Sequence, residues 1–332
     1  MKHLVGFRIF ESSGSGLTQE QEEFLNEHTK DNWKYDPTTG LVDVEGDFDC
    51  SLSGIPNFKG VKFGKVSGKF DCSNNKLLSL EGAPQECGFM FDCSANGLKS
   101  LEGAPSKCGG DFDCSNNRLT SLKGAPKQVG GSYYCRYNQL TTLEGVPREV
   151  KGNFDCSNNR LTSLKGAPQK CGDDFDCRNN QITTLEGAPK ECGGYFNCSW
   201  NHLTSLKGAP QKVGWRFDCS YNKLTSLEGA PWEVGGDFFC DAFALNEEEW
   251  NPERWLKILK SNVSPETHSL ILSLLSPDNL NQEIQKDPAG MVMKLKGIWN
   301  SPDFAATRAK LVWPQGYEEE MGIVGDISSI GF

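Results

Sequence analysis

Phe112-Asp113-Cys114-Ser115-Asn116-Asn117-Arg118-Leu119 is one copy of a pattern that recurs along most of this chain of 332 residues. Its cysteine repeats every 21 residues, at Cys72, Cys93, Cys114, Cys135, Cys156, Cys177, Cys198, Cys219 and Cys240. An aromatic residue lies two positions before each cysteine, at Phe70, Phe91, Phe112, Tyr133, Phe154, Phe175, Phe196, Phe217 and Phe238. A fixed period of this length is the sequence signature of a solenoid, in which each repeat forms one coil.

The composition of one coil predicts its local structure. The aromatic and the cysteine have the period of a strand, which places both side chains inward. An asparagine three positions after the cysteine, such as Asn138, is expected in the core, bonded to the backbone of neighbouring coils. Gly145 and Pro147 exclude a regular helix, so the return side of the coil is expected to be extended or polyproline-like.

The pattern resembles the leucine-rich repeat, with Phe154, Cys156, Asn159 and Leu161 in its apolar and asparagine positions. The short coil is most similar to the bacterial type found in secreted effectors of pathogens. Its residue pattern also resembles that of repeat proteins of tailed bacteriophages. The resemblance implies a leucine-rich-repeat-like solenoid with a parallel β-sheet on the concave face and an extended return side.

Three segments are expected from the limits of the repeat: an N-terminal cap over 1–46, the solenoid over 47–242 and an α-helical C-terminal cap over 243–332. In the first, Thr18 and Gln21 form a capping-box pattern that predicts a short acidic helix, and 41–44 alternates as a strand. In the last, the repeat is replaced by five capping residues that each stand directly before a proline, at Asn251, Ser264, Ser276, Asp287 and Ser301, which predict short helices.

Cysteine usage and charge limit the function classes. The chain has 14 cysteines, and the spacing indicates small buried residues rather than disulfides or a zinc site. Four further cysteines, Cys87, Cys108, Cys171 and Cys192, share a position with valine, which is typical of packing. Free thiols indicate a reducing, cytoplasmic compartment. The net charge of −10 lies in the two ends of the chain, which argues against nucleic-acid binding, and no segment could span a membrane.

Equivalent residues of stacked coils form columns about 4.8 Å apart. One column, immediately before the cysteines, is almost entirely aspartate and includes Asp113, Asp155, Asp176 and Asp218. The negative charge of this column indicates either a site for a cation or a basic partner, or only a repeated structural feature. In the second case solvent screens the carboxylates and nearby serines partly satisfy them. Two other columns alternate between glutamate and lysine from Glu144 and Glu149 onward, which predicts ion pairs that keep the return side soluble.

Departures from the repeat are the stronger functional signal. Aromatic and arginine residues replace the usual polar ones on the strand face at Tyr134, Arg136, Tyr137, Arg178, Tyr195, Trp200, Arg216 and Tyr221. Tyrosine, tryptophan and arginine are enriched at the centres of protein interfaces. These residues therefore predict a protein-binding patch, with mutual stacking and neutralisation of adjacent aspartates as the alternative interpretation.

No arrangement typical of catalysis or of a cofactor site is present, and the ubiquitin ligase domain of some related effectors is not expected, because no cysteine follows Cys240. The sequence thus predicts a non-enzymatic, phage-encoded scaffold that binds a protein in the host cytoplasm. The alternative is a structural component of a virion. For that alternative, Ile9-Phe10-Glu11 resembles the site at which T4-like phages trim capsid-targeted peptides, with cleavage after Glu11.

Overall fold

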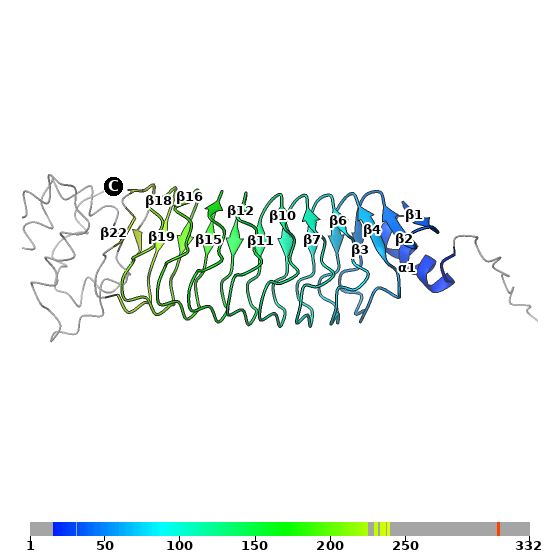
Figure 1. The fold of residues 1–332 in the computed structure, drawn as a ribbon, viewed down its shortest axis with the longest axis horizontal. Coiled ribbons are helices and arrows are strands. Elements are labelled where there is room, and N and C mark those ends of the chain that lie inside the picture. The colour runs from blue at the N-terminus through cyan, green and yellow to red at the C-terminus, as the bar shows by residue number, and fades with distance from the viewer. Residues whose placement is uncertain are drawn as a thin grey trace, which may run out of the picture. The chain divides into compact units, whose positions relative to one another are not determined.

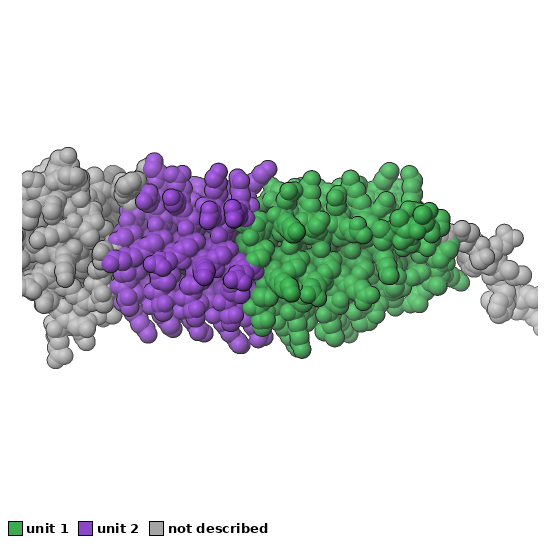
Figure 2. Space-filling view, viewed as in Figure 1, with its two compact units in different colours: residues 1–138, 145–147 green, residues 139–144, 148–332 purple. Residues whose placement is uncertain are grey.

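The computed structural model describes residues 16–30, 32–224, 229–231, 233–236, 238–239 and 311–312. The chain divides into two compact units, shown in Figure 2. Unit 1 comprises Met1–Asn138 and Gly145–Pro147, and unit 2 comprises Gln139–Glu144 and Arg148–Phe332. Within each unit the chain winds into a β-solenoid of 21-residue coils (Figure 1). This confirms the solenoid architecture predicted from the repeat.

A first ladder of parallel strands is formed by the aromatic-x-Cys segments. In unit 1 its strands are β3 (Phe48–Asp49), β5 (Phe70–Asp71), β7 (Phe91–Asp92), β9 (Phe112–Asp113) and β11 (Tyr133–Tyr134). In unit 2 they are β13 (Phe154–Asp155), β15 (Phe175–Asp176), β17 (Phe196–Asn197), β19 (Phe217–Asp218) and β21 (Phe238–Phe239). The register places each aromatic beside the aromatic of the next coil, as with Phe70 and Phe91.

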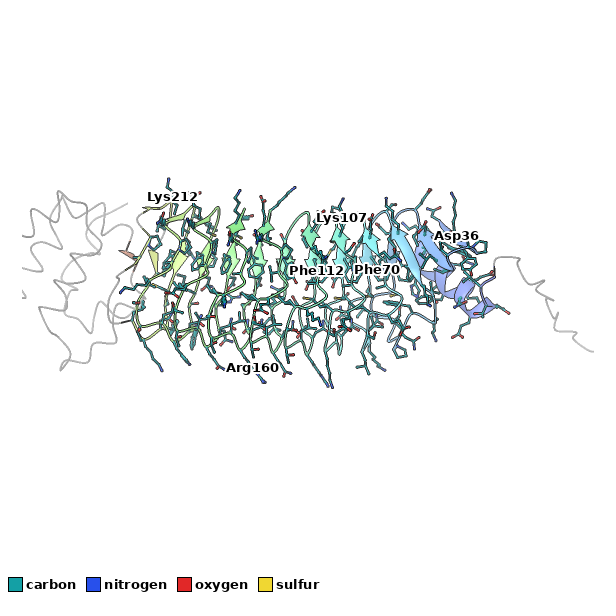
Figure 3. The ribbon with its side chains drawn as sticks, viewed as in Figure 1. Asp36, Phe70, Lys107, Phe112, Arg160 and Lys212 are labelled. Atoms are coloured by element: carbon teal, nitrogen blue, oxygen red, sulfur yellow. The ribbon has the colours of Figure 1, made fainter. Side chains whose placement is uncertain are left out.

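The core of each unit lies behind the first ladder. Its aromatics, cysteines and leucines are fully buried, as Phe112, Cys114 and Leu119 show. Successive rings stack, with centroids 5.4 Å apart for Phe70 and Phe91. Figure 3 labels Phe70 and Phe112 of this column, which Phe91 separates. Each buried phenylalanine contributes about 1.5–3 kcal/mol of burial free energy, so the repeated column is the main source of stability.

The asparagine column joins the coils through buried hydrogen bonds. Asn180 Nδ2 donates to the carbonyls of Cys156 and Cys177, both at 3.1 Å, and its Oδ1 accepts from the Leu161 backbone N–H at 2.9 Å. The same three contacts recur at Asn117 and Asn201. One side chain thus satisfies backbone groups of two coils, as the sequence predicts.

The return side forms a second parallel ladder, which the sequence analysis did not predict beyond an extended backbone. In unit 1 its strands are β4 (Phe63–Val66), β6 (Glu86–Cys87), β8 (Lys107–Cys108) and β10 (Gln128–Val129). In unit 2 they are β12 (Glu149–Val150), β14 (Lys170–Cys171), β16 (Glu191–Cys192), β18 (Lys212–Val213) and β20 (Glu233–Val234). In β12, β14 and β16 the first residue is charged and exposed, and the second is apolar and buried.

Alternating charges face each other across this second ladder. Glu86 lies in register with Lys107, Glu149 with Lys170 and Lys212 with Glu233. Figure 3 labels Lys107 and Lys212, one in each unit, at the outer edge of the ladder. In this column the predicted interleaving of opposite charges is therefore present. Glu149, Lys170 and Lys212 are exposed, and an exposed ion pair contributes only about 0–1 kcal/mol.

A helix covers the first strand of unit 1. Helix α1 (Gln19–Thr29) begins with the predicted capping box between Thr18 and Gln21. Its Phe24 ring lies 5.7 Å from the Phe48 ring of β3, and a nitrogen of His28 bonds the Asp49 carbonyl at 2.8 Å. An uncovered strand edge would pair with other chains, so α1 protects this end of the first ladder.

Two antiparallel strands complete the beginning of unit 1. Strands β1 (Trp33–Asp36) and β2 (Leu41–Val44) form a hairpin, and β2 pairs in parallel with β4 of the second ladder. The strand predicted over 41–44 is therefore confirmed. Of residues 243–332 the structure describes only β22 (Leu311–Val312), which pairs in parallel with β21. The predicted C-terminal helices and the segment around Glu11 lie outside the described residues.

Candidate protein-binding surface

Each coil leaves the first ladder through a residue in the left-handed conformation. It lies two positions after the cysteine, and asparagine is the commonest residue there, at Asn74, Asn116, Asn158 and Asn179, with φ between 53° and 58°. Asparagine tolerates this conformation, whereas a bulky side chain in it costs about 1–2 kcal/mol. We call this series the turn column. Its repeated asparagine is thus a local backbone requirement.

Trp200 and Tyr221 occupy the turn column of unit 2 despite that cost, with φ of 55° and 54°. Their rings stack with centroids 4.1 Å apart and an interplanar angle of 18°. They are 55% and 54% exposed, so the rings add little to the buried core. A strained backbone that presents an exposed aromatic pair is an outlier of the kind that clusters at functional sites.

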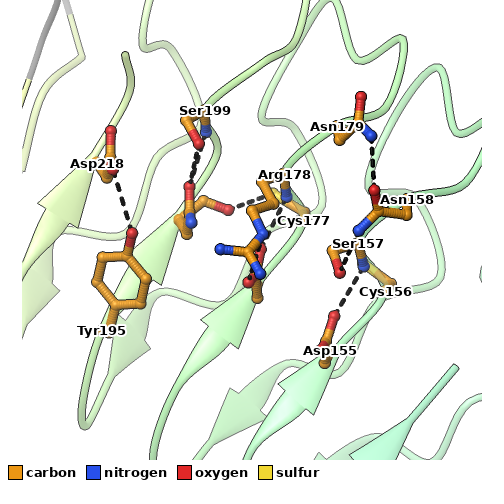
Figure 4. Close-up of polar contacts among 12 residues, drawn as sticks. Asp155, Cys156, Ser157, Asn158, Cys177, Arg178, Asn179, Tyr195, Ser199 and Asp218 are labelled. Carbon is orange, nitrogen blue, oxygen red and sulfur yellow. Dashed lines mark hydrogen bonds and ion pairs between the residues drawn. The ribbon is translucent and has the colours of Figure 1, made fainter. Parts of the chain in front are cut away.

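The preceding two coils of unit 2 show the polar form of the same column. Asn179 Nδ2 donates to Asn158 Oδ1 at 2.6 Å (Figure 4). The backbone continues unchanged, because Asn179 N–H bonds the Ser199 carbonyl and Trp200 N–H bonds the Ser220 carbonyl, both at 3.0 Å. The aromatic pair therefore replaces an amide pair on the same scaffold.

Arg216 lies among three aromatic rings of unit 2. Its guanidinium carbon is 4.5 Å from the Phe239 ring centroid, 5.8 Å from that of Trp215 and 5.9 Å from that of Tyr195. Cation–π contacts of this kind orient the guanidinium and contribute about 0.5–2 kcal/mol. The contact with Tyr195 is the mutual stacking that the sequence suggested. The rings of Trp215 and Phe239 were not among the predicted residues.

Trp215 is the more informative of the two missed residues. It is 61% exposed and stands at a position that is glycine in other coils, such as Gly131 and Gly194. That departure from the repeat was visible in the sequence. Phe239 offered a weaker signal, because it occupies the aspartate column in the coil where the repeat ends.

Tyr195 connects this cluster to the aspartate column. Its hydroxyl donates to Asp218 Oδ2 at 3.2 Å (Figure 4). Burial raises the pKa of Tyr195 above its ordinary value, and the Asp218 carboxylate raises it further. The tyrosine therefore stays protonated and holds the carboxylate in place. Tyr195, Arg216 and Asp218, all predicted from sequence, are thus brought together in unit 2.

The aspartate column serves the turn that follows each strand. Asp113 Oδ1 accepts from the Ser115 N–H at 2.8 Å, and Asp155 Oδ1 accepts from the Ser157 N–H at 2.9 Å. Asn197 accepts from Ser199 in the same way at 3.0 Å. This is the local bond by which Asp and Asn stabilise turns. An amide oxygen accepts this hydrogen bond equally well, so the turn alone does not require a charged side chain.

Burial and mutual repulsion act on these carboxylates. Asp155 is 8% exposed, contrary to the fully outward orientation expected from strand alternation, because its side chain folds back on its own turn. Burial, reinforced by the Asp155 charge, raises the pKa of Asp176 to about 7. Arg178 opposes this, with its Nε 3.4 Å from Asp176 Oδ2. In unit 1, burial raises the pKa of Asp92 to about 6.

The remaining predicted residues belong to unit 1. The Arg136 guanidinium carbon lies 5.8 Å from the Tyr134 ring centroid. Tyr137 is 53% exposed and has a φ of 54° in the turn column. Unit 1 therefore presents its own smaller group of arginine and tyrosine side chains.

Within the described ranges, no three or more histidine, cysteine, aspartate or glutamate side chains come close enough to hold a metal ion. No helix formed by the described residues is both long enough and apolar enough to cross a membrane.

Neither a protein-family model nor a curated protein sequence matches the chain. Among solved structures, the chain is similar to YopM from Yersinia enterocolitica WA-314, with a TM-score of 0.37 and 17% sequence identity. The match covers 58% of this chain and 64% of YopM, so this chain spans less than two thirds of that protein's length.

Proposed function

We propose that the protein is a non-enzymatic scaffold that binds another protein through unit 2. The binding residues are Trp200, Tyr221, Tyr195, Trp215 and Arg216, which we call the aromatic surface. The observation that supports this most is the stacked pair at Trp200 and Tyr221, two half-exposed rings in left-handed backbone positions. Other coils place asparagine at these positions, and asparagine adopts the left-handed backbone at a lower free-energy cost. The two rings are therefore explained by contacts with a partner outside the coil.

The chemistry of the aromatic surface suits a protein partner. Tryptophan, tyrosine and arginine contribute most of the energy of protein interfaces. Stacking of Trp200 on Tyr221 restricts both rings before binding, and the three rings around Arg216 do the same for its side chain. Restricted side chains lose less entropy on association, which strengthens binding at constant contact area.

We extend this proposal to the setting suggested by the sequence resemblance. The protein is phage-encoded, acts in the cytoplasm of the host cell and recognises its partner on the side of the coil formed by the first ladder. The three segments 1–46, 47–242 and 243–332 serve as an N-terminal cap, the solenoid and a C-terminal cap. The alternative is a structural virion component with a peptide trimmed after Glu11, and mass spectrometry of purified particles distinguishes the two roles.

The test of the proposal is affinity capture from host lysate with three matched baits. They are the unmodified chain, the double variant Trp200→Asn/Tyr221→Asn, and Phe89→Gly as the control. Both sets of changes restore the residue that other coils use, and Phe89 is itself 63% exposed, in unit 1. We expect one protein to be retained by the unmodified chain and by the control and lost from the double variant. Equal retention by all three baits would refute the role of the aromatic surface.

A further inference from the structure

The sheet that contains the second ladder of unit 1 has an open edge. Its strands follow the order β1-β2-β4-β6-β8-β10, so β1 (Trp33–Asp36) is an outermost strand (Figure 1). In the part of the chain that the structure describes, no strand pairs with the other side of β1. The first strand of the first ladder, β3, is instead covered by α1. The two ladders of unit 1 therefore begin differently, and the second presents a strand that further pairing would extend.

The hydrogen bonds of the β1–β2 hairpin determine which backbone groups face the open edge. The Glu45 N–H donates to the Asn32 carbonyl at 2.8 Å, and β1 continues from there in antiparallel register with β2. In an antiparallel pair, hydrogen-bonded and non-hydrogen-bonded positions alternate along each strand. Lys34 therefore exchanges hydrogen bonds with β2, whereas the N–H and C=O groups of Trp33 and Tyr35 point away from β2, toward the open edge.

One face of β1 fixes the strand to the rest of unit 1. Trp33 and Tyr35 lie on this face and are half-buried. The indole N–H of Trp33 donates to Asn26 Oδ1 of α1 at 2.7 Å. The position of β1 is therefore set before it meets a partner, which reduces the entropy lost on association.

The opposite face of β1 carries one positive and one negative side chain, Lys34 and Asp36, and both are exposed. The Asp36 carboxylate is oriented by its own turn, where it accepts from the Thr38 N–H at 2.8 Å and from the Thr39 hydroxyl at 2.9 Å. Lys34 Nζ lies 3.9 Å from a Glu45 carboxylate oxygen, with the two side chains 83% and 82% exposed. A contact this exposed is weak, so Lys34 can exchange it for another carboxylate.

The two charges select one register for pairing with a second copy of the chain. Copies of an edge strand related by a two-fold axis pair antiparallel, with the same residues contributed by both. Tyr35 fits the axis, because its N–H and C=O both face the edge, and Lys34 of each copy then lies opposite Asp36 of the other. An axis one residue away in either direction places Lys34 opposite Lys34, or Asp36 opposite Asp36. Like charges directly opposite each other destabilise a strand pair.

We propose that two copies of this chain associate through β1, paired antiparallel about Tyr35. The Tyr35 N–H of each copy donates to the Tyr35 carbonyl of the other, and the six-stranded sheets of the two copies become one. Two Lys34–Asp36 pairs and one pair of Tyr35 rings accompany these hydrogen bonds. A contact of one short strand belongs to the weak class of interfaces, so the dimer is reversible, with a Kd between about 1 µM and 1 mM.

The test is sedimentation equilibrium of the full chain alone, over a concentration series at low salt. Tyr35→Pro removes the N–H that faces the edge and leaves the bonds of Lys34 to β2 in place. Lys34→Glu places like charges opposite each other. Tyr35→Val is the matched control, because valine keeps the N–H and suits a strand. We expect a concentration-dependent dimer for the unmodified chain, a Kd within about fivefold of it for Tyr35→Val, and a Kd at least about tenfold higher for Tyr35→Pro and Lys34→Glu.

Amide hydrogen exchange of the unmodified chain gives a second readout that does not depend on how the variants fold. We expect the protection of the Tyr35 N–H to rise with protein concentration and that of the Lys34 N–H to stay constant. A monomeric mass at every concentration up to about 1 mM, a dimer that Tyr35→Pro and Lys34→Glu leave unchanged, or equal protection of Tyr35 at low and high concentration would each overturn the proposal. The result is independent of the aromatic surface, because β1 belongs to unit 1 and no partner protein is present.

Discussion

Two pairs of successive coils in unit 2 share one interior and differ at the surface. The coils that begin at Phe154 and Phe175 place Asn158 and Asn179 in the turn column, where their amides hydrogen-bond. The coils that begin at Phe196 and Phe217 place Trp200 and Tyr221 there, where their rings stack. Phenylalanine, cysteine and the core asparagine are the same in all four coils. The interior therefore determines the fold, and the turn column is where the surface can change without altering it.

The comparison also separates side chains that hold the coils together from side chains that do not. Asn180 makes buried bonds to two coils, and a substitution there removes all of them. Trp200 keeps its backbone bond to Ser220 whatever its side chain is. Substitutions at these two classes of position should therefore differ in their effect on stability.

The largest effect is expected from the core asparagine. Asn180→Leu removes hydrogen bonds to the Cys156 and Cys177 carbonyls and to the Leu161 N–H, and leaves those groups buried. We expect the free energy of unfolding to fall by about 3–5 kcal/mol, measured by urea denaturation. A loss below about 1 kcal/mol would show that the interior column is not what holds the coils together.

The next effect concerns the aspartate column and its pH dependence. The pKa of Asp176 is about 7 in the folded protein and 3.8 in the reference state, so the folded state binds the proton more tightly. Stability is therefore highest below pH 4 for this group and is lost as the pH rises toward 7. Asp176→Asn should remove that loss and stabilise the protein above pH 7, by on the order of 2 kcal/mol.

The measurement for Asp176 is the free energy of unfolding against pH for both proteins. The substitution preserves the turn, since Asn197 forms the same bond to its own turn. Parallel curves for the two proteins between pH 4 and 8 would contradict the assigned pKa.

A smaller effect is expected in the turn column itself. Tyr137→Asn relieves a tyrosine with a φ of 54° and should raise the free energy of unfolding by about 1 kcal/mol. The reverse change in the same unit, Asn116→Tyr, should lower it by a similar amount. Thermal unfolding of both variants checks this, and equal Tm values for the two would show that the column is not strained.

The smallest effect is expected on the outer face of the second ladder. Lys170 is exposed and lies in register with Glu149. Lys170→Ala should change the free energy of unfolding by less than about 0.5 kcal/mol, measured by urea denaturation at low salt. A loss above about 1.5 kcal/mol would mean that the alternating charges stabilise the coil rather than only keep it soluble.

The interior could be predicted from the sequence because the repeat presents each of its positions many times. The inward Phe and Cys, the bonded core asparagine and the Thr18 capping box all follow from local chemistry. The second ladder was missed because glycine and proline near its strands suggested an irregular backbone. Its pairing depends on coil stacking, which no single coil reveals.

The candidate surface could be predicted only in part. Trp200, Tyr221, Tyr195 and Arg216 stood out as departures from the repeat, but their contacts depend on how neighbouring coils stack. The aspartates were expected to point outward, and the structure shows instead that each bonds the turn two residues later, as Asp155 does with Ser157. Trp215 was overlooked although it replaces a glycine.

Titration calorimetry of the captured partner tests the central claim most directly. The titrated proteins are the unmodified chain, Trp200→Asn/Tyr221→Asn, Phe89→Gly and Asp155→Asn/Asp176→Asn/Asp218→Asn. The account predicts that the Kd rises at least about 30-fold in the aromatic double variant and stays within about threefold in the other two. An unchanged Kd in the aromatic variant, with a large increase in the aspartate variant, would contradict it and assign recognition to the aspartate column.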